Sequence, residues 1–347
     1  MTPDIDDSNV DKDLDVSTAN TMRERSDESR LKLWLLLKAN RLVVTGALAV
    51  VFFVVFVIGV SVLPPPLIPQ LESSDTVDTV FSAMIGAIIT GVTLVVTISQ
   101  LVLSQENGPL GDQRKRMEDS MDFREYTEEL IGSPSPADPS AFLRNIVDVC
   151  QDRAEAVRDG FDDIESDQLR WEIDEFTQSV IGNSEEVREQ LDGATFGDFT
   201  VTFAALNFNY GWKIFQVERL LNDHEGELGE RENDLLNELK TALSMFGPAR
   251  EHVKTLYFEW ALTSLSQLII YVSIPALAVA GIMTVIGEAG TFPGSTLGIE
   301  NIALLLGAAL TVTILPFFLL VSYISRVVTL AKRTLAIEPL ILRDSQR

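Results

Sequence analysis

The chain has little of the chemistry that most catalytic and metal-binding sites need. Its 347 residues include one cysteine, Cys150, and two histidines, His224 and His252. A single cysteine excludes a disulfide framework and a cysteine-based zinc site. No phosphate-binding loop, dinucleotide fingerprint, serine-hydrolase elbow or HExxH motif occurs in the sequence. We therefore expect no enzymatic activity, no bound metal and no cofactor.

Basic residues are also scarce, since 27 Lys and Arg stand against 51 Asp and Glu and give a net charge of −24. This balance excludes a basic nucleic-acid binder, so we expect no nucleic-acid partner. Yet 46% of the residues are apolar and the mean hydropathy is +0.18. The two facts agree only if charge and hydrophobicity are segregated along the chain, which excludes a uniform globular domain and a disordered acidic chain.

Charge is absent from four long stretches, which are residues 42–71, 79–105, 260–287 and 301–325. A membrane-spanning helix needs about 20 mostly apolar residues. The first helix must end near Leu63, because Pro64, Pro65 and Pro66 cannot continue it. The sequence predicts an all-α membrane protein with four transmembrane helices, two plus two, around a helical cytoplasmic domain.

Lysine and arginine flank these stretches on one side only. They precede the first and third stretches and follow the second and fourth, whereas the short loops 64–78 and 288–300 contain none. We therefore expect the chain to lie in the cell membrane. By the positive-inside rule, both termini and the middle region are on the cytoplasmic side. The predicted order is a disordered acidic tail (1–30), two spans (31–105), an acidic helical domain (106–259), two spans (260–325) and a basic tail (326–347).

The middle region carries 35 acids and 15 bases, and arginine outnumbers lysine 19 to 8 in the whole chain. An acidic, lysine-poor composition resembles that of proteins from halophilic archaea. Molar salt shortens the Debye length to about 3 Å and so screens the repulsion within such a domain. An acidic surface made for a basic partner or for cations is the alternative.

Helix signals recur in the middle region. Ser140 is predicted to cap a helix, Asn183 has capping-box spacing with Glu186, and Gly247 followed by Pro248 predicts one helix end and the next start. The last helix has no stop signal before the third span and is expected to enter it.

Three local features of this region leave alternatives open. The aromatic-rich segment 196–215 favours a domain core or subunit interface over a ligand pocket or membrane-surface helix. Cys150 lies on an apolar helix face and is expected in the core. The run DHEGE (223–227) can bind a cation through carboxylates but lacks calcium-loop spacing.

The second span carries an ordered set of small and polar residues. Spacings of 4, 3, 4, 3 and 4 place six of them on one helical face: Gly86, Thr90, Thr93, Thr97, Gln100 and Ser104. We call this set the stripe. It can line a water-filled pathway, form a close-packed helix interface, or do both around the symmetry axis of an oligomer.

The third span has a smaller polar face that includes Gln267 and Tyr271. Gln100 and Gln267 are both expected near the cytoplasmic ends of their spans. A hydrogen-bonded pair or a ring of amides is therefore predicted.

Residues 82–111 (SAMIGAIITGVTLVVTISQLVLSQENGPLG) resemble the helix-then-SQxxxP segment of a widespread family of uncharacterised bacterial membrane proteins. The two-plus-two order of the spans, with helices between them, resembles bestrophin-type anion channels in topology. The latter resemblance implies a channel and assigns no residue.

No Asp, Glu, Lys, Arg or His lies within the four stretches, which argues against a proton relay, an ion-coupled transporter and a voltage sensor. Two hypotheses for function remain. The first is a homo-oligomeric, channel-like or transport protein that passes a small ion along the stripe. The second is a scaffold, sensor or assembly factor that is held in the lipid bilayer and acts through its helical domain.

Overall fold

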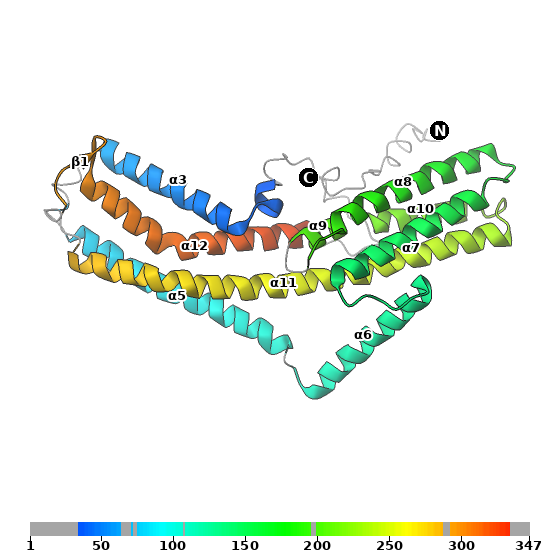
Figure 1. Ribbon diagram of the computed structural model, residues 1–347, viewed down its shortest axis with the longest axis horizontal. Helices are drawn as coiled ribbons and strands as arrows, with labels where there is room; N and C mark the ends of the chain where they lie inside the picture. The colour runs from blue at the N-terminus through cyan, green and yellow to red at the C-terminus, as the bar shows by residue number, and fades with distance from the viewer. Residues whose placement is uncertain are drawn as a thin grey trace, which may run out of the picture. The chain divides into compact units, whose positions relative to one another are not determined.

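The computed structural model of the chain describes residues 34–63, 71, 75–106, 108–195, 199–286 and 292–333. Within these ranges the fold is helical apart from a two-stranded hairpin, β1 (Ser295–Thr296) and β2 (Ile299–Glu300) (Figure 1). The chain divides into two compact units. We call Trp34–Gln113 with Phe258–Ala331 the span unit, and Arg114–Tyr257 the helical domain. The predicted disordered tail 1–30 and most of the predicted basic tail 326–347 lie outside the described residues.

Four helices are long and apolar enough to cross a membrane, as the sequence predicts. They are α3 (Arg41–Val62), α5 (Thr76–Glu106), α11 (Glu230–Ile286) and α12 (Asn301–Arg333). The first ends at Val62, with Leu63 as its C-cap immediately before the run of prolines that cannot extend it. A short π-helix, η2 (Trp34–Lys38), precedes α3.

Two clusters of apolar side chains hold the span unit together. One joins α5, α11 and α12 through Phe81, Met283 and Leu306. The other joins the same three helices further along their lengths, with Val95 and Leu319 among its buried residues. These three helices therefore form the packed centre of the unit.

Helix α3 reaches this centre along a narrow contact with α12. A β-carbon added at Gly307 would lie 2.8 Å from Val57 and 3.2 Å from the Phe53 ring. Phe52 and Phe318 also meet edge to face, with ring centroids 5.7 Å apart. The missing side chain of Gly307 thus allows the two helices to approach closely.

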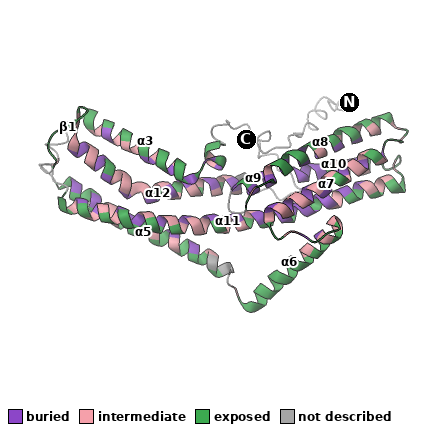
Figure 2. Cartoon of the chain, in the orientation of Figure 1, coloured by how far each residue is buried: buried purple, intermediate pink, exposed green. Residues whose placement is uncertain are grey.

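The helical domain contains α6 (Leu110–Ile131, which begins in the span unit), α7 (Pro139–Gly160), α8 (Asp167–Leu191), α9 (Phe199–Leu206), α10 (Tyr210–Asp223) and the first part of α11. Helices α7 to α11 contribute to one buried core. The predicted apolar faces supply much of it, including Ile146, Cys150, Leu169, Ile173 and Leu243. Figure 2 shows the contrast with α6, whose first half is exposed throughout.

Three predicted helix boundaries in this domain are wrong. Asp138, rather than Ser140, caps α7 and accepts a hydrogen bond from the Ala141 amide at 2.9 Å. Asn183 starts no helix and instead lies buried inside α8. At α7, the cap provided by Asp138 outweighs the capping signal of Ser140 two residues later. At Asn183, a tertiary partner outweighs the local capping pattern.

The third error concerns Gly247 and Pro248, where α11 continues without a break. The reason is that the buried face of this helix continues on both sides of the pair, through Phe246, Ala249 and Val253. Burial of this face offsets the cost of an internal proline, which is about 3 kcal/mol. The expectation that the last helix enters the third span is confirmed, because α11 is one helix of 57 residues.

The aromatic-rich segment belongs mainly to the domain core. Phe208 and Tyr210 are buried and both pack against Phe246, with ring centroids 4.6 and 5.7 Å away. Trp212 stacks on the half-exposed Phe215. The favoured prediction of a core is therefore confirmed for Phe208 and Tyr210 but not for the exposed Phe215, while Phe196 lies outside the described residues.

Candidate functional site

All six residues of the stripe lie on an exposed face of α5. The buried residues of the same helix include Phe81, Ile88, Val95 and Ser99, which face the other helices of the span unit. At 100° per residue, the centre of the stripe and the centre of this buried face are roughly 150° apart. The stripe thus points away from the helices of its own chain.

The hydroxyl groups of the stripe are already satisfied as donors. Thr90, Thr93 and Thr97 each donate to the carbonyl oxygen four residues earlier, at 2.8 Å. Ser104 donates to the Leu101 carbonyl at 2.7 Å. These bonds let the helix carry hydroxyls through an apolar environment at low cost, and they leave oxygen lone pairs as the outward-facing polar groups.

The two predicted residues of the third span are exposed as well. Tyr271 is 68% exposed and Gln267 is also exposed. Among the described residues, no hydrogen bond joins Gln267 to Gln100, which is itself exposed. Within one chain the predicted amide pair is therefore not formed, whereas an amide ring that several copies would share stays a prediction.

A cluster that sequence reasoning missed joins the start of α3 to α12. Arg41 and Arg326 are 4% and 8% exposed, and both guanidinium groups donate to the carbonyl oxygen of Ala39 at 2.6 Å. Arg41 also donates to the carbonyls of Leu35, at 2.8 Å, and Ser322, at 3.1 Å. In return, the Ser322 hydroxyl donates to the Arg41 carbonyl at 3.0 Å.

This arginine cluster (Arg41, Arg326, Ser322 and Ala39) serves as a structural anchor. A guanidinium presents five donors in a fixed plane, which suits it to bind several carbonyls at once. The cluster connects residues 281 positions apart in sequence. In the sequence, Arg41 and Arg326 stand out only as basic residues at the ends of spans. Such residues indicate the orientation of a span in the membrane and do not indicate that the side chain is buried.

The helical domain contains a buried polar group of its own around Lys213. This lysine is 1% exposed, donates to Asn183 at 2.8 Å, and lies 5.0 Å from the centre of the Phe208 ring. Asn183 in turn donates to the Asn207 carbonyl at 2.9 Å. The arrangement ties α8 to the chain between α9 and α10, which explains why Asn183 sits inside a helix.

Cys150 lies in the same core and is fully buried. Burial raises the pKa of its thiol to about 12. The thiol therefore keeps its proton at neutral pH and is a poor nucleophile.

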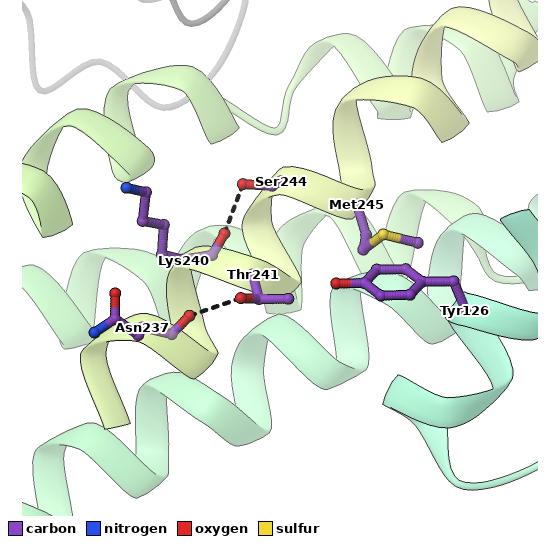
Figure 3. A pocket seen from close by; sticks show the side chains of 6 residues that line it. All are labelled: Tyr126, Asn237, Lys240, Thr241, Ser244 and Met245. Atoms are coloured by element: carbon purple, nitrogen blue, oxygen red, sulfur yellow. Dashed lines mark hydrogen bonds between the residues drawn. The ribbon is translucent and has the colours of Figure 1, made fainter. Parts of the chain in front are cut away.

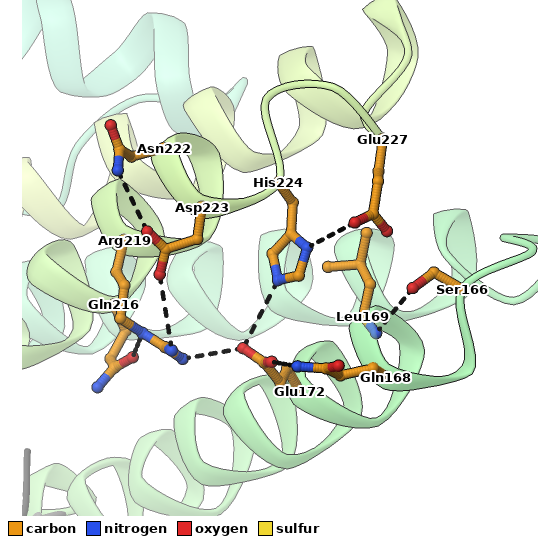
Figure 4. A network of polar contacts seen from close by, with 10 residues as sticks. All are labelled: Ser166, Gln168, Leu169, Glu172, Gln216, Arg219, Asn222, Asp223, His224 and Glu227. Atoms are coloured by element: carbon orange, nitrogen blue, oxygen red, sulfur yellow. Dashed lines mark hydrogen bonds and ion pairs between the residues drawn. The ribbon is translucent and has the colours of Figure 1, made fainter. Parts of the chain in front are cut away.

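His224 bridges two carboxylates rather than forming a cation site (Figure 4). Its ring nitrogens lie 3.4 Å from Glu227 and 3.8 Å from Glu172, and Glu172 also pairs with Arg219 at 3.2 Å. Hydrogen bonds from Ser166 and His224 hold the pKa of Glu227 below its usual value. In the described part of the chain, no group of three metal-ligating side chains converges.

A hollow of about 390 Å³ lies between α6 and α11 (Figure 3). Tyr126 lines it from α6, and Lys240, Thr241, Ser244 and Met245 are among its α11 residues. The Thr241 and Ser244 hydroxyls donate to backbone carbonyls of their own helix, and Lys240 pairs with a carboxylate of α10 at 2.8 Å. Three of the polar side chains that line the hollow are thus already engaged within the chain.

Fold and site together define a helical protein with four candidate membrane helices and a polar stripe on the exposed face of one of them. The chain belongs to a family of unknown function (DUF7972), whose family model matches residues 7–347. The searches of curated proteins and of solved structures found no match. The family match extends over both units, so the span helices and the helical domain belong to one family architecture.

Proposed function

We propose that the protein is a homo-oligomeric, channel-like protein of the cell membrane that conducts a small ion along the α5 stripe. Both termini and the helical domain would be cytoplasmic in this arrangement. The observation that carries the proposal is the position of the stripe on the exposed face of α5, opposite the face that packs within the chain. Copies arranged around an axis would bring their stripes together.

The degree of burial of each span supports this arrangement. Helix α3 is the most apolar span and the least buried, which suits a helix surrounded by lipid. Helix α5 is the least apolar of the four, yet only 17% of its span is buried. Small and hydroxyl-bearing faces of membrane helices usually pack against another helix, and the described residues of one chain supply no such helix to this face.

The chemistry of the stripe favours a cation as the conducted ion. The threonine hydroxyls donate back to their own helix, so their oxygen lone pairs face outward. Neutral oxygen dipoles of this kind can replace the water around a cation. The absence of Asp, Glu, Lys, Arg and His from the four charge-free stretches supports passive conduction rather than coupled transport.

Cross-linking tests the oligomer. Thr97→Cys places a thiol on the stripe, and Ser99→Cys places one of nearly the same size on the buried face. In oxidised membranes we expect a covalent dimer from Thr97→Cys and none from Ser99→Cys, while the buried Cys150 stays unreactive. A Thr97→Cys protein that remains monomeric, both on cross-linking and by mass in detergent, would refute the shared axis.

Ion flux tests the pathway. In liposomes with a KCl gradient, Thr93→Val with Thr97→Val should slow flux by about tenfold or more, because a barrier raised by about 1.4 kcal/mol has that effect. The matched Thr93→Ser and Thr97→Ser protein keeps both oxygens and should conduct. A cation preference appears as the sign of the reversal potential, and absence of flux from the parent protein would refute conduction.

The second candidate function is a membrane-anchored scaffold, sensor or assembly factor. One observation favours it: Trp171 of α8 is 65% exposed and lines a hollow of about 360 Å³ with Arg158 and Arg170. Exposed tryptophan and arginine are the side chains most enriched at energetically important protein contacts. Trp171→Ala should abolish recovery of a partner in a pull-down under this hypothesis and leave ion flux unchanged.

We also propose that the protein works in a salt-rich cytoplasm, as the resemblance to halophilic archaeal proteins implies. Ion pairs such as Arg144 with Asp192 and Arg153 with Glu238 lie at the surface of the helical domain. Residues 106–259 hold 15 bases for 35 acids, so most of their acids have no basic partner and interact with water and salt ions. The melting temperature should therefore rise steeply with KCl concentration.

A further inference from the structure

The short π-helix η2, which precedes the first span, leaves one of its sides exposed. Trp34 and Leu35 are 53% and 46% exposed, whereas Leu37 is buried in the span unit. The wide helical turn is closed by a hydrogen bond of 2.8 Å from the Ala39 amide to the Trp34 carbonyl. An aromatic ring and an aliphatic side chain therefore point outward together from a segment whose other side is packed.

A break in the backbone separates η2 from α3 and fixes its direction. Asn40 is not helical (ψ 129°), and its side chain accepts a hydrogen bond from the Leu42 amide, so α3 begins at Arg41. The guanidinium of Arg41 donates to the carbonyls of Leu35 and Ala39, on either side of the turn. The segment is thus tied to the start of α3 but turned away from the α3 axis, as the first blue segment in Figure 1 shows.

The lengths of two spans place η2 at one edge of the membrane core. The 22 residues of α3 are about 33 Å long, which is close to the ~30 Å of hydrocarbon in a bilayer. In α12, about 32 Å of helix separates Asn301 from Ser322, which exchanges hydrogen bonds with Arg41. Both spans therefore reach the same edge at Arg41 and Ser322, directly beside η2.

The exposed apolar surface continues from η2 along α3. Leu42 and Val43 in the first turn of α3 are exposed, and further exposed apolar residues follow as far as Val62. Because α3 is the most apolar and the least buried span, this surface suits contact with lipid. Tryptophan is enriched where such a surface meets the headgroups, because its ring is apolar and its indole N–H is polar.

We propose that Trp34 and Leu35 of η2 insert into the cytoplasmic headgroup boundary of the bilayer and set the depth at which α3 crosses it. Tryptophan and leucine are the side chains that short interfacial segments bury at this boundary. A second copy of the chain is the competing occupant, but the level of Arg41 and Ser322 places Trp34 where the hydrocarbon ends. The proposal rests on the membrane location proposed above and requires neither an oligomer nor ion conduction.

Quenching by brominated lipids measures the depth of Trp34. The chain has four tryptophans, and phenylalanine replaces the other three: Trp171, Trp212 and Trp260. The full chain is placed in nanodiscs whose acyl chains carry bromine either near the headgroup or near the chain end. The matched probe is Val51→Trp with phenylalanine at all four native positions, because Val51 is exposed on α3 and lies about 15 Å along the helix from Arg41.

We expect the shallow bromines to quench Trp34 more strongly and the deep bromines to quench Val51→Trp more strongly. An unquenched Trp34 beside a quenched Val51→Trp would overturn the proposal, would leave the spans in the membrane and, with a blue-shifted emission, would assign η2 to a second copy. Stronger quenching of Trp34 by the deep bromines would also overturn it. If Val51→Trp is not quenched either, the membrane location fails together with this proposal.

A single substitution gives the complementary measurement if the multiply substituted protein is unstable. Trp34→Phe in the otherwise unchanged chain should lower the fraction of the total emission that the shallow bromines quench. An unchanged quenched fraction would overturn the proposal.

Discussion

Removal of the Arg41 side chain should loosen α3 from the rest of the span unit. The guanidinium of Arg41 donates to the carbonyls of Leu35, Ala39 and Ser322. Arg326 also reaches the Ala39 carbonyl, so that contact is partly duplicated. Within the described residues, the hydrogen bonds to the Leu35 and Ser322 carbonyls come from Arg41.

The size of the effect follows from these two contacts. Hydrogen bonds to a charged group contribute about 1.5–3 kcal/mol each, which gives about 3–6 kcal/mol for the pair. Relief of the desolvation cost of a buried charge offsets part of this loss. We therefore expect Arg41→Met, which keeps an unbranched apolar side chain, to lower the free energy of unfolding by about 2–4 kcal/mol.

Thermal and detergent-induced unfolding of the full chain, followed by tryptophan fluorescence, measures this loss. Arg41→Lys keeps the charge but not the planar donors, so it should recover less than half of the lost stability. Ser322→Ala removes the reciprocal bond, and its effect should be less than additive with Arg41→Met because the two groups contact each other. Stability of Arg41→Met within about 0.5 kcal/mol of the parent would refute the anchor.

Three further outcomes can be checked by simpler measurements. Gly307→Ala should lower stability by about 1–3 kcal/mol, because its β-carbon would meet Val57 at 2.8 Å, whereas the control Gly281→Ala meets no atom within 4 Å; equal melting temperatures would contradict this. The fold lowers the pKa of Glu227, so the ionised carboxylate stabilises the domain at any pH above the ordinary glutamate pKa. This contribution is lost as the pH falls through the lowered pKa of Glu227. Glu227→Gln should therefore reduce the fall of melting temperature with decreasing pH on the acid side. Cys150, whose pKa is about 12, should resist maleimide at pH near 8 in the folded protein and react after unfolding; native labelling would contradict its burial.

The four spans could be predicted because length and absence of charge are properties of a linear stretch. The structure places a candidate membrane helix over each charge-free stretch, and α3 ends where the prolines require. The continuous path from the helical domain into the third span followed from the absence of a stop signal. These features need no knowledge of what lies next to the helix.

Features that depend on tertiary neighbours could not be predicted in the same way. Asn183 looked like a helix start because its local pattern is that of a cap, but its side-chain Oδ1 accepts a hydrogen bond from Lys213 of another helix. Gly247 and Pro248 looked like a boundary because the cost of an internal proline is local, whereas the burial that offsets it comes from other helices. The arginine cluster joins positions far apart in sequence, and no periodicity relates them.

The direction in which the stripe points also depends on tertiary neighbours and could not be predicted from the sequence. Spacing alone placed six small and polar residues on one face of α5, but could not say whether that face points inward or outward. The answer depends on Phe81, Ile88 and Val95, which are no more apolar than the exposed Ile89, Leu94 and Ile98. Hydropathy therefore could not separate the two faces, and only packing against α11 and α12 does.

The outward position of the stripe also bears on the topological resemblance to anion channels. An anion pathway needs donors that point into it, such as amide or hydroxyl hydrogens or basic side chains. In α5 the threonine hydrogens are committed to backbone carbonyls, and no basic residue lies among Gly86, Thr90, Thr93, Thr97 and Gln100. Only the amide of Gln100 offers N–H donors on this face. An axis lined by such helices would present mainly oxygen acceptors, so the span order that resembles an anion channel would here surround a lining suited to cations.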